Sequence, residues 1–204
     1  MSGGSFFCKK QKADNMNFNQ IMIRCSAPTL CNIKPANLFF VKNQDFSEES
    51  FKEWKTSFFK LGLMCFRIRL SEISSAIFVC NVCWERKILE DEFIQAYLSK
   101  KGYHCRSVLD FVKEFSVRVQ KNTDFPHEVG VVLGYPVEDV IEFENHQGHD
   151  CKYCGYWKCY SDVEKAKYCK WRYKNCSCIC KKWYDEGYSI NQIIIKYQNL
   201  ENAA

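Results

Sequence analysis

Apolar and polar residues alternate along residues 63–70, where Arg67 and Arg69 fall between apolar positions. Alternation with a period of two is typical of a strand that buries one face. A second apolar stretch follows at 75–82 after a short polar link, which favours a hairpin of antiparallel strands. Residues 38–41, with the sequence LFFV, form another short apolar run. The pattern predicts a small, mainly antiparallel sheet in the first half of the chain.

Helical spacing of apolar residues dominates the remaining stretches. The predicted helices cover residues 16–24, 48–60, 84–98, 106–119, 164–184 and 190–197. Segments 45–48 and 161–164 resemble capping boxes, and Gly62, Gly102 and Gly187 suit helix ends. The stretch 25–39 contains Pro28 and Pro35, and it is predicted to be an irregular, rigid loop, because proline fixes φ and removes a donor. The predicted fold class is α+β, a small sheet packed by helices with a helical C-terminal half.

Residues 126–146 contain two prolines and two glycines. Pro126 suits the first turn of a short helix that ends at Gly134, and Pro136 suits the start of the next helix. We therefore predict a helical hairpin over 126–146, followed by a cysteine-rich helical region over 151–197. Residues 1–15 are polar and rich in Gly, Ser and Lys, which predicts a flexible tail. Residues 16–204 are then expected to form a single α+β domain.

Composition points to a reducing compartment. The 204 residues include 14 cysteines and carry a net charge of +5. The first 15 residues contain no apolar core of a signal peptide, and the longest apolar runs are too short to span a bilayer, so we expect a cytoplasmic protein. Reduced thiols or metal ligands are then favoured over disulfides. For most of the first seven cysteines, a small buried hydrophobic side chain is the simpler interpretation.

Four blocks of sequence resemble the bacterial family known as domain of unknown function 3793 (DUF3793). They are CSAPTL with IKPANLF at 25–39, FPHEVGVVLGYPVEDVIEF at 125–143, GYWKCYSD at 155–162, and YKNC with the helix to EGYSI at 173–190. The resemblance implies a cytosolic, single-domain family of anaerobic bacteria, and it brings no assigned activity. Cys159 stands where the family more often has an aliphatic residue, and the pair His146/His149 is not a family feature. A site built on those residues would be peculiar to this chain.

The densest group of candidate ligands is His146, His149, Cys151 and Cys154, in the spacing H-x-x-H-x-C-x-x-C. Two imidazoles and two thiolates form a tetrahedral ligand set suited to zinc, and iron is the other candidate. Four ligands within nine residues rarely close around a metal without a second element. The cysteines that could supply further ligands are Cys159, Cys176, Cys178 and Cys180. The alternative is a cysteine-rich but metal-free C-terminal half.

If the C-x-C-x-C segment of those cysteines is helical, only Cys176 and Cys180 share a face. Its spacing matches no ferredoxin sequence, which disfavours an iron–sulfur cluster.

A second candidate site combines Cys25, His127 and Glu128. His127 and Glu128 follow Pro126 at a predicted helix start, where a histidine stays neutral and is suited to acid–base chemistry or ligation. Glu128 is equally well explained as a favourable partner of the helix dipole. Cys25 becomes a candidate nucleophile if His127 lies beside it, although a helix C-terminus raises a thiol pKa and so disfavours this role.

Basic and aromatic residues are interleaved between Lys152 and Lys182. This segment contains nine Lys and Arg residues against Asp162 and Glu164. Such a surface suits a nucleic-acid or protein partner, and the alternative is an amphipathic helix whose aromatic face packs inward. The sequence contains none of the common nucleotide-binding or hydrolase motifs, so enzyme activity is left open. The leading hypothesis is a thiol- or metal-handling protein acting in redox or metal homeostasis, and the alternative is a non-enzymatic adaptor that uses the 152–182 face.

Overall fold

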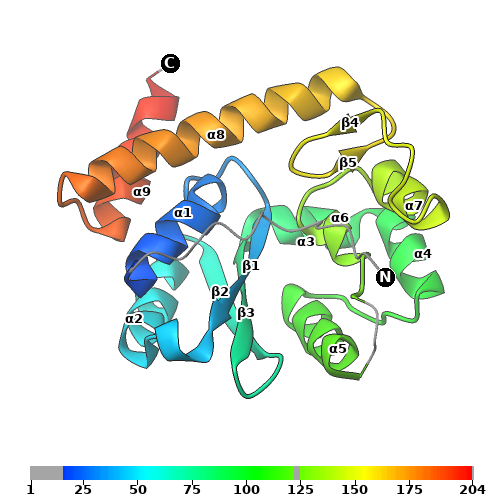
Figure 1. Ribbon diagram of the computed structural model, residues 1–204, viewed down its shortest axis with the longest axis horizontal. Coiled ribbons are helices and arrows are strands. Elements are labelled where there is room, and N and C mark those ends of the chain that lie inside the picture. Colours follow the sequence, from blue (N-terminus) through cyan, green and yellow to red (C-terminus); the bar gives the residue numbers. More distant parts are fainter. Residues whose placement is uncertain (1–15, 122–124, 204) are drawn as a thin grey trace.

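A three-stranded antiparallel sheet lies between two groups of helices (Figure 1). The computed structural model describes residues 16–121 and 125–203, so the predicted tail over 1–15 lies outside the described residues. The strands are β1 (Ala36–Lys42), β2 (Leu63–Arg69) and β3 (Ser74–Asn81), in the order β1-β3-β2. The predicted hairpin is confirmed, with Leu63 opposite Asn81 and Arg69 opposite Ser75. The α+β fold class is therefore confirmed.

Both faces of the sheet are covered, because successive side chains of a strand point to opposite sides. Along β3, Ile77 and Val79 enter one hydrophobic cluster while Ala76 and Phe78 enter the other. All residues from Ser75 to Cys80 are buried, which explains why this strand has an apolar run rather than an alternation. The central strand thus separates two hydrophobic cores.

One core, which we call the α1-side cluster, lies between the sheet and helices from the two ends of the described chain. They are α1 (Phe18–Leu30), α2 (Glu48–Phe59), the second half of α8 (Val163–Asp185) and α9 (Ile190–Asn202). Phe18, Trp54 and Phe58 supply its aromatic part, and Ile193 and Ile194 of α9 are fully buried in it. A short 3-10 helix, η1 (Asn43–Asp45), links β1 to α2.

The other core, the α5-side cluster, lies against the middle of the chain. Its elements are α3 (Val82–Glu90), α4 (Glu92–Lys100), α5 (Val108–Lys121), α6 (Val129–Val132), α7 (Val137–Asn145) and the small hairpin β4 (Tyr153–Cys154) and β5 (Lys158–Cys159). The buried side chain of Asp139 links α7 to the β4–β5 hairpin and to the residues directly after it. It accepts hydrogen bonds from the Trp157 indole at 2.6 Å and from the backbone N–H groups of Tyr160 and Ser161 at 2.8 Å.

The loop predicted at 25–39 is wrong in its first part, because α1 continues to Leu30 with Pro28 inside it. Proline in the last turn removes one backbone hydrogen bond, and the buried run Ser26 to Leu30 offsets that loss through packing. The Pro28 carbonyl accepts from the N–H groups of Ile33 and Lys34, which closes the end of the helix.

Other helix boundaries also differ from the prediction. The single helix predicted at 84–98 is divided at Asp91, whose side chain accepts from the N–H of Ile94 and starts α4. The caps of α2 and α8 are Ser47 and Asp162. Within the described residues, no helix combines the length and apolar character needed to cross a membrane.

Candidate functional site

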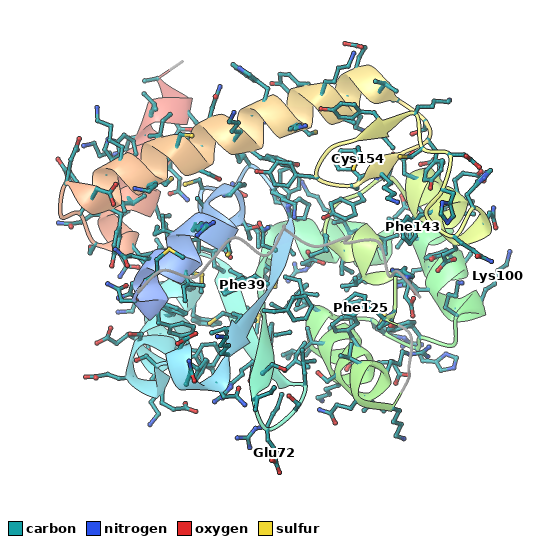
Figure 2. The ribbon with its side chains drawn as sticks, viewed as in Figure 1. Phe39, Glu72, Lys100, Phe125, Phe143 and Cys154 are labelled. Carbon is teal, nitrogen blue, oxygen red and sulfur yellow. The ribbon has the colours of Figure 1, made fainter. Side chains whose placement is uncertain are left out.

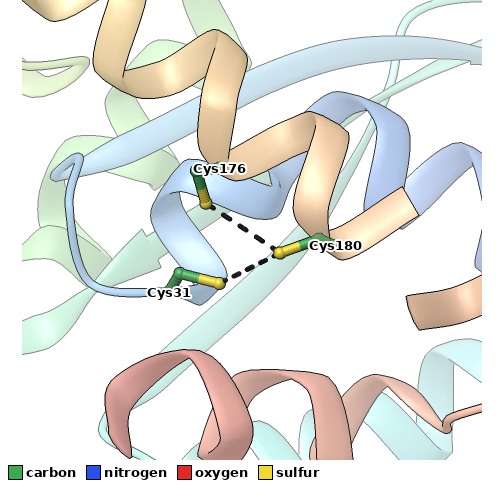
Figure 3. Close-up of side chains that lie close together, drawn as sticks. All are labelled: Cys31, Cys176 and Cys180. Atoms are coloured by element: carbon green, nitrogen blue, oxygen red, sulfur yellow. Dashed lines mark hydrogen bonds between the residues drawn. The ribbon is translucent and has the colours of Figure 1, made fainter. Parts of the chain in front are cut away.

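Three cysteine side chains converge where the end of α1 meets α8 (Figure 3). The Cys31 Sγ lies 3.4 Å from the Cys180 Sγ, and the Cys176 Sγ lies 3.9 Å from it. All three sulfurs lie within 4.8 Å of one another, and the three residues are at most 2% exposed. In the described parts of the chain, no other group of three Cys, His, Asp or Glu side chains brings ligand atoms this close together.

Local structure places each thiol. Cys176 and Cys180 lie one helical turn apart on the inner face of α8, while Cys178 between them is exposed, as the helical period requires. Cys31 is the C-cap residue of α1, and its N–H donates to the Ala27 carbonyl, while the Asn32 N–H donates to the Thr29 carbonyl. The next residue, Asn32, has a φ of 61°, so the chain turns away directly after the thiol. Figure 1 shows α1 and α8 side by side, which brings residues 149 positions apart into contact.

The three thiols share hydrogen bonds that shift their pKa values. Hydrogen bonds from the Cys176 and Cys31 thiols lower the pKa of Cys180, so its thiolate is the favoured acceptor in the group. Hydrogen bonds to Cys176 and Cys180, together with burial, raise the pKa of Cys31, and the hydrogen bond to Cys180 raises the pKa of Cys176. Burial and the neighbouring Cys176 also raise the pKa of Tyr197, whose hydroxyl lies beside this thiol. Within the group, these shifts favour a negative charge on Cys180 over one on Cys31 or Cys176.

The spacing of the sulfurs fits a metal ion. Thiolates bind zinc at about 2.3 Å, which places tetrahedral sulfur ligands about 3.8 Å apart. The measured separations of 3.4 and 3.9 Å lie on either side of this value. A disulfide needs sulfurs at about 2.05 Å, so the thiols are closer to a metal-binding arrangement than to a bonded pair.

The ligand set predicted at 146–154 is dispersed. His146 is the C-cap of α7, with its ring stacked on Tyr160 and its Nε2 3.2 Å from a Glu142 carboxylate oxygen. His149 is exposed in the following turn, Cys151 is half-buried, and Cys154 is exposed on β4 (Figure 2). The structure does not bring these four side chains together as a cluster, so zinc or iron at this turn stays a prediction.

The residues predicted as catalytic lie in different surroundings. Cys25 is half-buried within α1 and packs against the α1-side cluster. The His127 ring lies against Phe143 with ring centroids 4.8 Å apart. Glu128 is buried at the start of α6, 4.0 Å from the Arg118 guanidinium. Glu128 thus has an ion-pair partner that the sequence did not indicate, and both the dipole interpretation of Glu128 and the catalytic pairing of Cys25 with His127 stay predictions.

The aromatic residues of the 152–182 segment divide between the two sides of α8. Tyr173 is buried and meets Tyr156 edge to face. Tyr168 and Trp171 instead point to solvent, 57% and 61% exposed. Of the aromatic residues that α8 contributes to this segment, only Tyr173 packs inward, while Trp157 and Tyr160 before the helix are also buried.

Two features of the interior are not apparent from the sequence. The first is the place of Cys31 in the thiol group, because the sequence favours a small buried hydrophobic role for this residue; only the shared helical face of Cys176 and Cys180 indicates part of the group. The second is a pair of buried charged residues. Lys34 and Glu85 are both buried. Burial lowers the pKa of Lys34 to about 7 and raises the pKa of Glu85. Both Glu85 oxygens lack a hydrogen-bond partner among the described residues.

Comparison with known proteins places the chain in a family. The family model described as "Protein of unknown function (DUF3793)" matches residues 22–194. This range includes Cys31, Cys176 and Cys180. Searches of curated proteins and of solved structures found no match. The chain belongs to the DUF3793 family.

Proposed function

We propose that the protein binds a thiophilic metal ion through Cys31, Cys176 and Cys180, and that it acts in thiol or metal handling in the cytoplasm. The observation that carries the proposal is the buried group of three sulfurs within 4.8 Å of one another. A reducing compartment keeps such thiols available as ligands. Redox or metal homeostasis is the corresponding cellular role.

The donor set favours a soft ion. Thiolate ligands select monovalent copper, zinc and iron. Among the described residues, no His, Asp, Glu or further Cys lies close enough to complete a fourth position. Monovalent copper is satisfied by three sulfur ligands, whereas zinc and iron need a fourth ligand beyond the three thiolates. The ion class is therefore thiophilic, with monovalent copper the best fit to the ligand count.

Binding replaces hydrogen bonds by metal bonds. In the structure the three thiols share hydrogen bonds through their protons, with the Cys180 Sγ 3.4 Å from the Cys31 Sγ and 3.9 Å from the Cys176 Sγ. A metal ion takes the place of those protons, because thiolates and not thiols are metal ligands. The site is closed to solvent, which is typical of structural or storage sites and not of catalytic centres with an open position. The bound ion would tie the end of α1 to α8.

Metal analysis of the anaerobically purified full chain tests the proposal. We expect about one ion per chain in the wild type and loss of that ion in Cys176→Ala/Cys180→Ala. Matched controls are Cys178→Ala, which is exposed on the same helix, and Cys65→Ala, which is buried in the same cluster. Both controls should retain the metal. Added metal should also raise the melting temperature of the wild type and leave that of the double variant unchanged.

Two outcomes would contradict the proposal. The first is a wild-type protein that stays metal-free when challenged with copper, zinc or iron under reducing conditions. The second is loss of metal from Cys151→Ser/Cys154→Ser with retention in the Cys176/Cys180 variant, which would place the site at the exposed turn. Should the buried variants fail to fold, alkylation of the wild type with and without metal decides the question, read by peptide mass spectrometry: added metal should slow the alkylation of Cys31 and Cys180 and leave that of buried Cys65 unchanged.

A further inference from the structure

The outward face of α8 carries a group of side chains that the thiol site does not use. Figure 2 shows side chains projecting from α8 on the side away from the sheet. The exposed residues of its first half include Lys167, Tyr168, Lys170, Trp171 and Lys174. By the helical period, Trp171 lies opposite the buried face that holds Cys176 and Cys180.

Positive charge is concentrated on this segment. Residues 152–182 hold nine of the chain's 29 basic residues and two of its 24 acidic residues, which leaves 20 basic and 22 acidic residues elsewhere. The net positive charge of the whole protein therefore comes from this segment. Lys167 is paired with Glu164 at 2.8 Å, whereas no described acidic side chain lies within ion-pair distance of Lys170 or Lys174.

The surroundings of these two lysines leave their charge unneutralised. The Lys170 ammonium lies 5.1 Å from the centre of the Tyr153 ring, an arrangement that orients the side chain without cancelling its charge. Lys174 is exposed one turn further along the helix. Both ammonium groups are therefore available to an anionic partner.

Two aromatic rings stand among these lysines. Tyr168 and Trp171 have ring centroids 6.1 Å apart and planes inclined by 31°. Both project from a convex helical surface and are more than half exposed. Aromatic rings flanked by cationic side chains are the elements with which proteins stack unpaired bases and hold the phosphate backbone. A duplex buries its base faces in its own stack and offers none to these rings.

We propose that the outward face of α8 binds single-stranded nucleic acid, with Tyr168 and Trp171 stacking on bases and with Lys170 and Lys174 binding phosphates. The inference does not depend on the metal site, because the thiols lie on the buried side of the helix. It gives the protein a polyanionic partner in addition to an ion.

Fluorescence anisotropy of a labelled oligouridine, titrated with the full chain, measures this binding. Replacing both rings in Tyr168→Ala/Trp171→Ala should weaken binding on the order of tenfold or more, because each stacked base contributes strongly. Lys170→Glu/Lys174→Glu should also weaken binding and reduce the slope of log affinity against log salt by about 0.7 for each phosphate that is no longer neutralised. The positions are exposed, so the fold should be unaffected, as checked by an unchanged melting temperature.

Matched controls come from other helices. Phe93→Ala removes an exposed ring from α4, and Lys52→Glu/Lys60→Glu reverses two exposed charges at α2; both should bind like the wild type. Cys176→Ala/Cys180→Ala should retain nucleic-acid binding, which separates this inference from the metal proposal. Binding of a single-stranded DNA oligomer supports the proposal as well.

Four results would overturn the inference. The first three are absence of binding at low salt, equal affinity for single strands and for a duplex of the same length, and wild-type affinity in the ring variant. The fourth is equally effective competition by heparin, which would show that the surface binds polyanions by charge alone, without base stacking.

Discussion

The two cysteine-containing regions differ in how they bring candidate ligands together. At the turn after α7, His146, His149, Cys151 and Cys154 lie within nine residues of sequence, yet they are half-buried or exposed and do not form a cluster. At the contact of α1 with α8, Cys31 comes from a segment far from Cys176 and Cys180, yet the three sulfurs form a buried group.

The comparison shows that ligand-type residues that are close in sequence need not bring their ligand atoms close together in space. In the turn, His146 caps a helix and stacks on Tyr160, and Cys154 faces solvent from a two-residue strand, so their directions are set by different local structures. In the buried group, the regular helix α8 sets the directions of Cys176 and Cys180, the end of α1 sets that of Cys31, and packing sets the distance. Regular elements hold side chains more precisely than turns do.

The largest expected effect concerns the anchor of the turn region. Asp139→Ala should lower the free energy of unfolding by about 3–5 kcal/mol, because it leaves the Trp157 indole and two backbone N–H groups without their buried acceptor. Urea denaturation measures this loss. Asp150→Asn, at an exposed position of the same region, is the control and should be nearly neutral, because asparagine tolerates the φ of 57° at this position. An Asp139 variant as stable as the wild type would show that the hairpin packs without this anchor.

The same carboxylate gives a pH dependence. Burial alone would raise the pKa of Asp139, and its hydrogen bonds from Trp157 and from the backbone of Tyr160 and Ser161 outweigh this and lower it. A depressed pKa stabilises the folded state above the carboxyl's ordinary pKa, and this contribution is lost as pH falls through the folded-state pKa. The stability difference between wild type and Asp139→Ala should therefore shrink in acid.

An effect that grows with pH is expected at Lys34, whose ammonium lies 5.4 Å from the Tyr135 ring centre. Burial lowers its pKa to about 7, so the unfolded chain binds the proton more tightly. Stability relative to Lys34→Met should therefore rise above pH 7, by at most about 1.4 kcal/mol per pH unit, until the ordinary lysine pKa is reached. Denaturation of both proteins between pH 7 and 10 measures it, and parallel curves would contradict the prediction.

The smallest effect is expected at His146. Its contact with Glu142 is an exposed pair, and such pairs contribute about 0–1 kcal/mol. His146→Gln should leave both stability and metal content nearly unchanged, in contrast to Cys31→Ala, which should remove the metal. Measuring metal content of the two variants side by side sharpens the comparison, and metal loss in His146→Gln would reverse it.

Much of the fold follows from local rules. The β2–β3 hairpin follows from apolar stretches joined by a short polar link, and the end of α8 follows from Gly187, which has a φ of 95°. Predicted boundaries are wrong where side chains compete with the helix or packing outweighs propensity, as at Asp91, which divides one predicted helix, and at Pro28, which α1 accommodates. Hydrophobic periodicity averages over a whole helix face, so it does not register the effect of a single capping residue or of one buried turn.

The sequence by itself determined the α+β class, the family, the shared face of Cys176 and Cys180, and the basic, aromatic character of 152–182. Only the tertiary structure decided that Cys31 joins the two helical thiols and that Tyr168 and Trp171 face solvent while Tyr173 is buried. The physical reason is the separation in sequence over which each kind of interaction acts. Caps, turns and helical faces depend on neighbours within about four residues. The contact between Cys31 and Cys180 depends on how α1 packs against α8, which is set by the whole α1-side cluster.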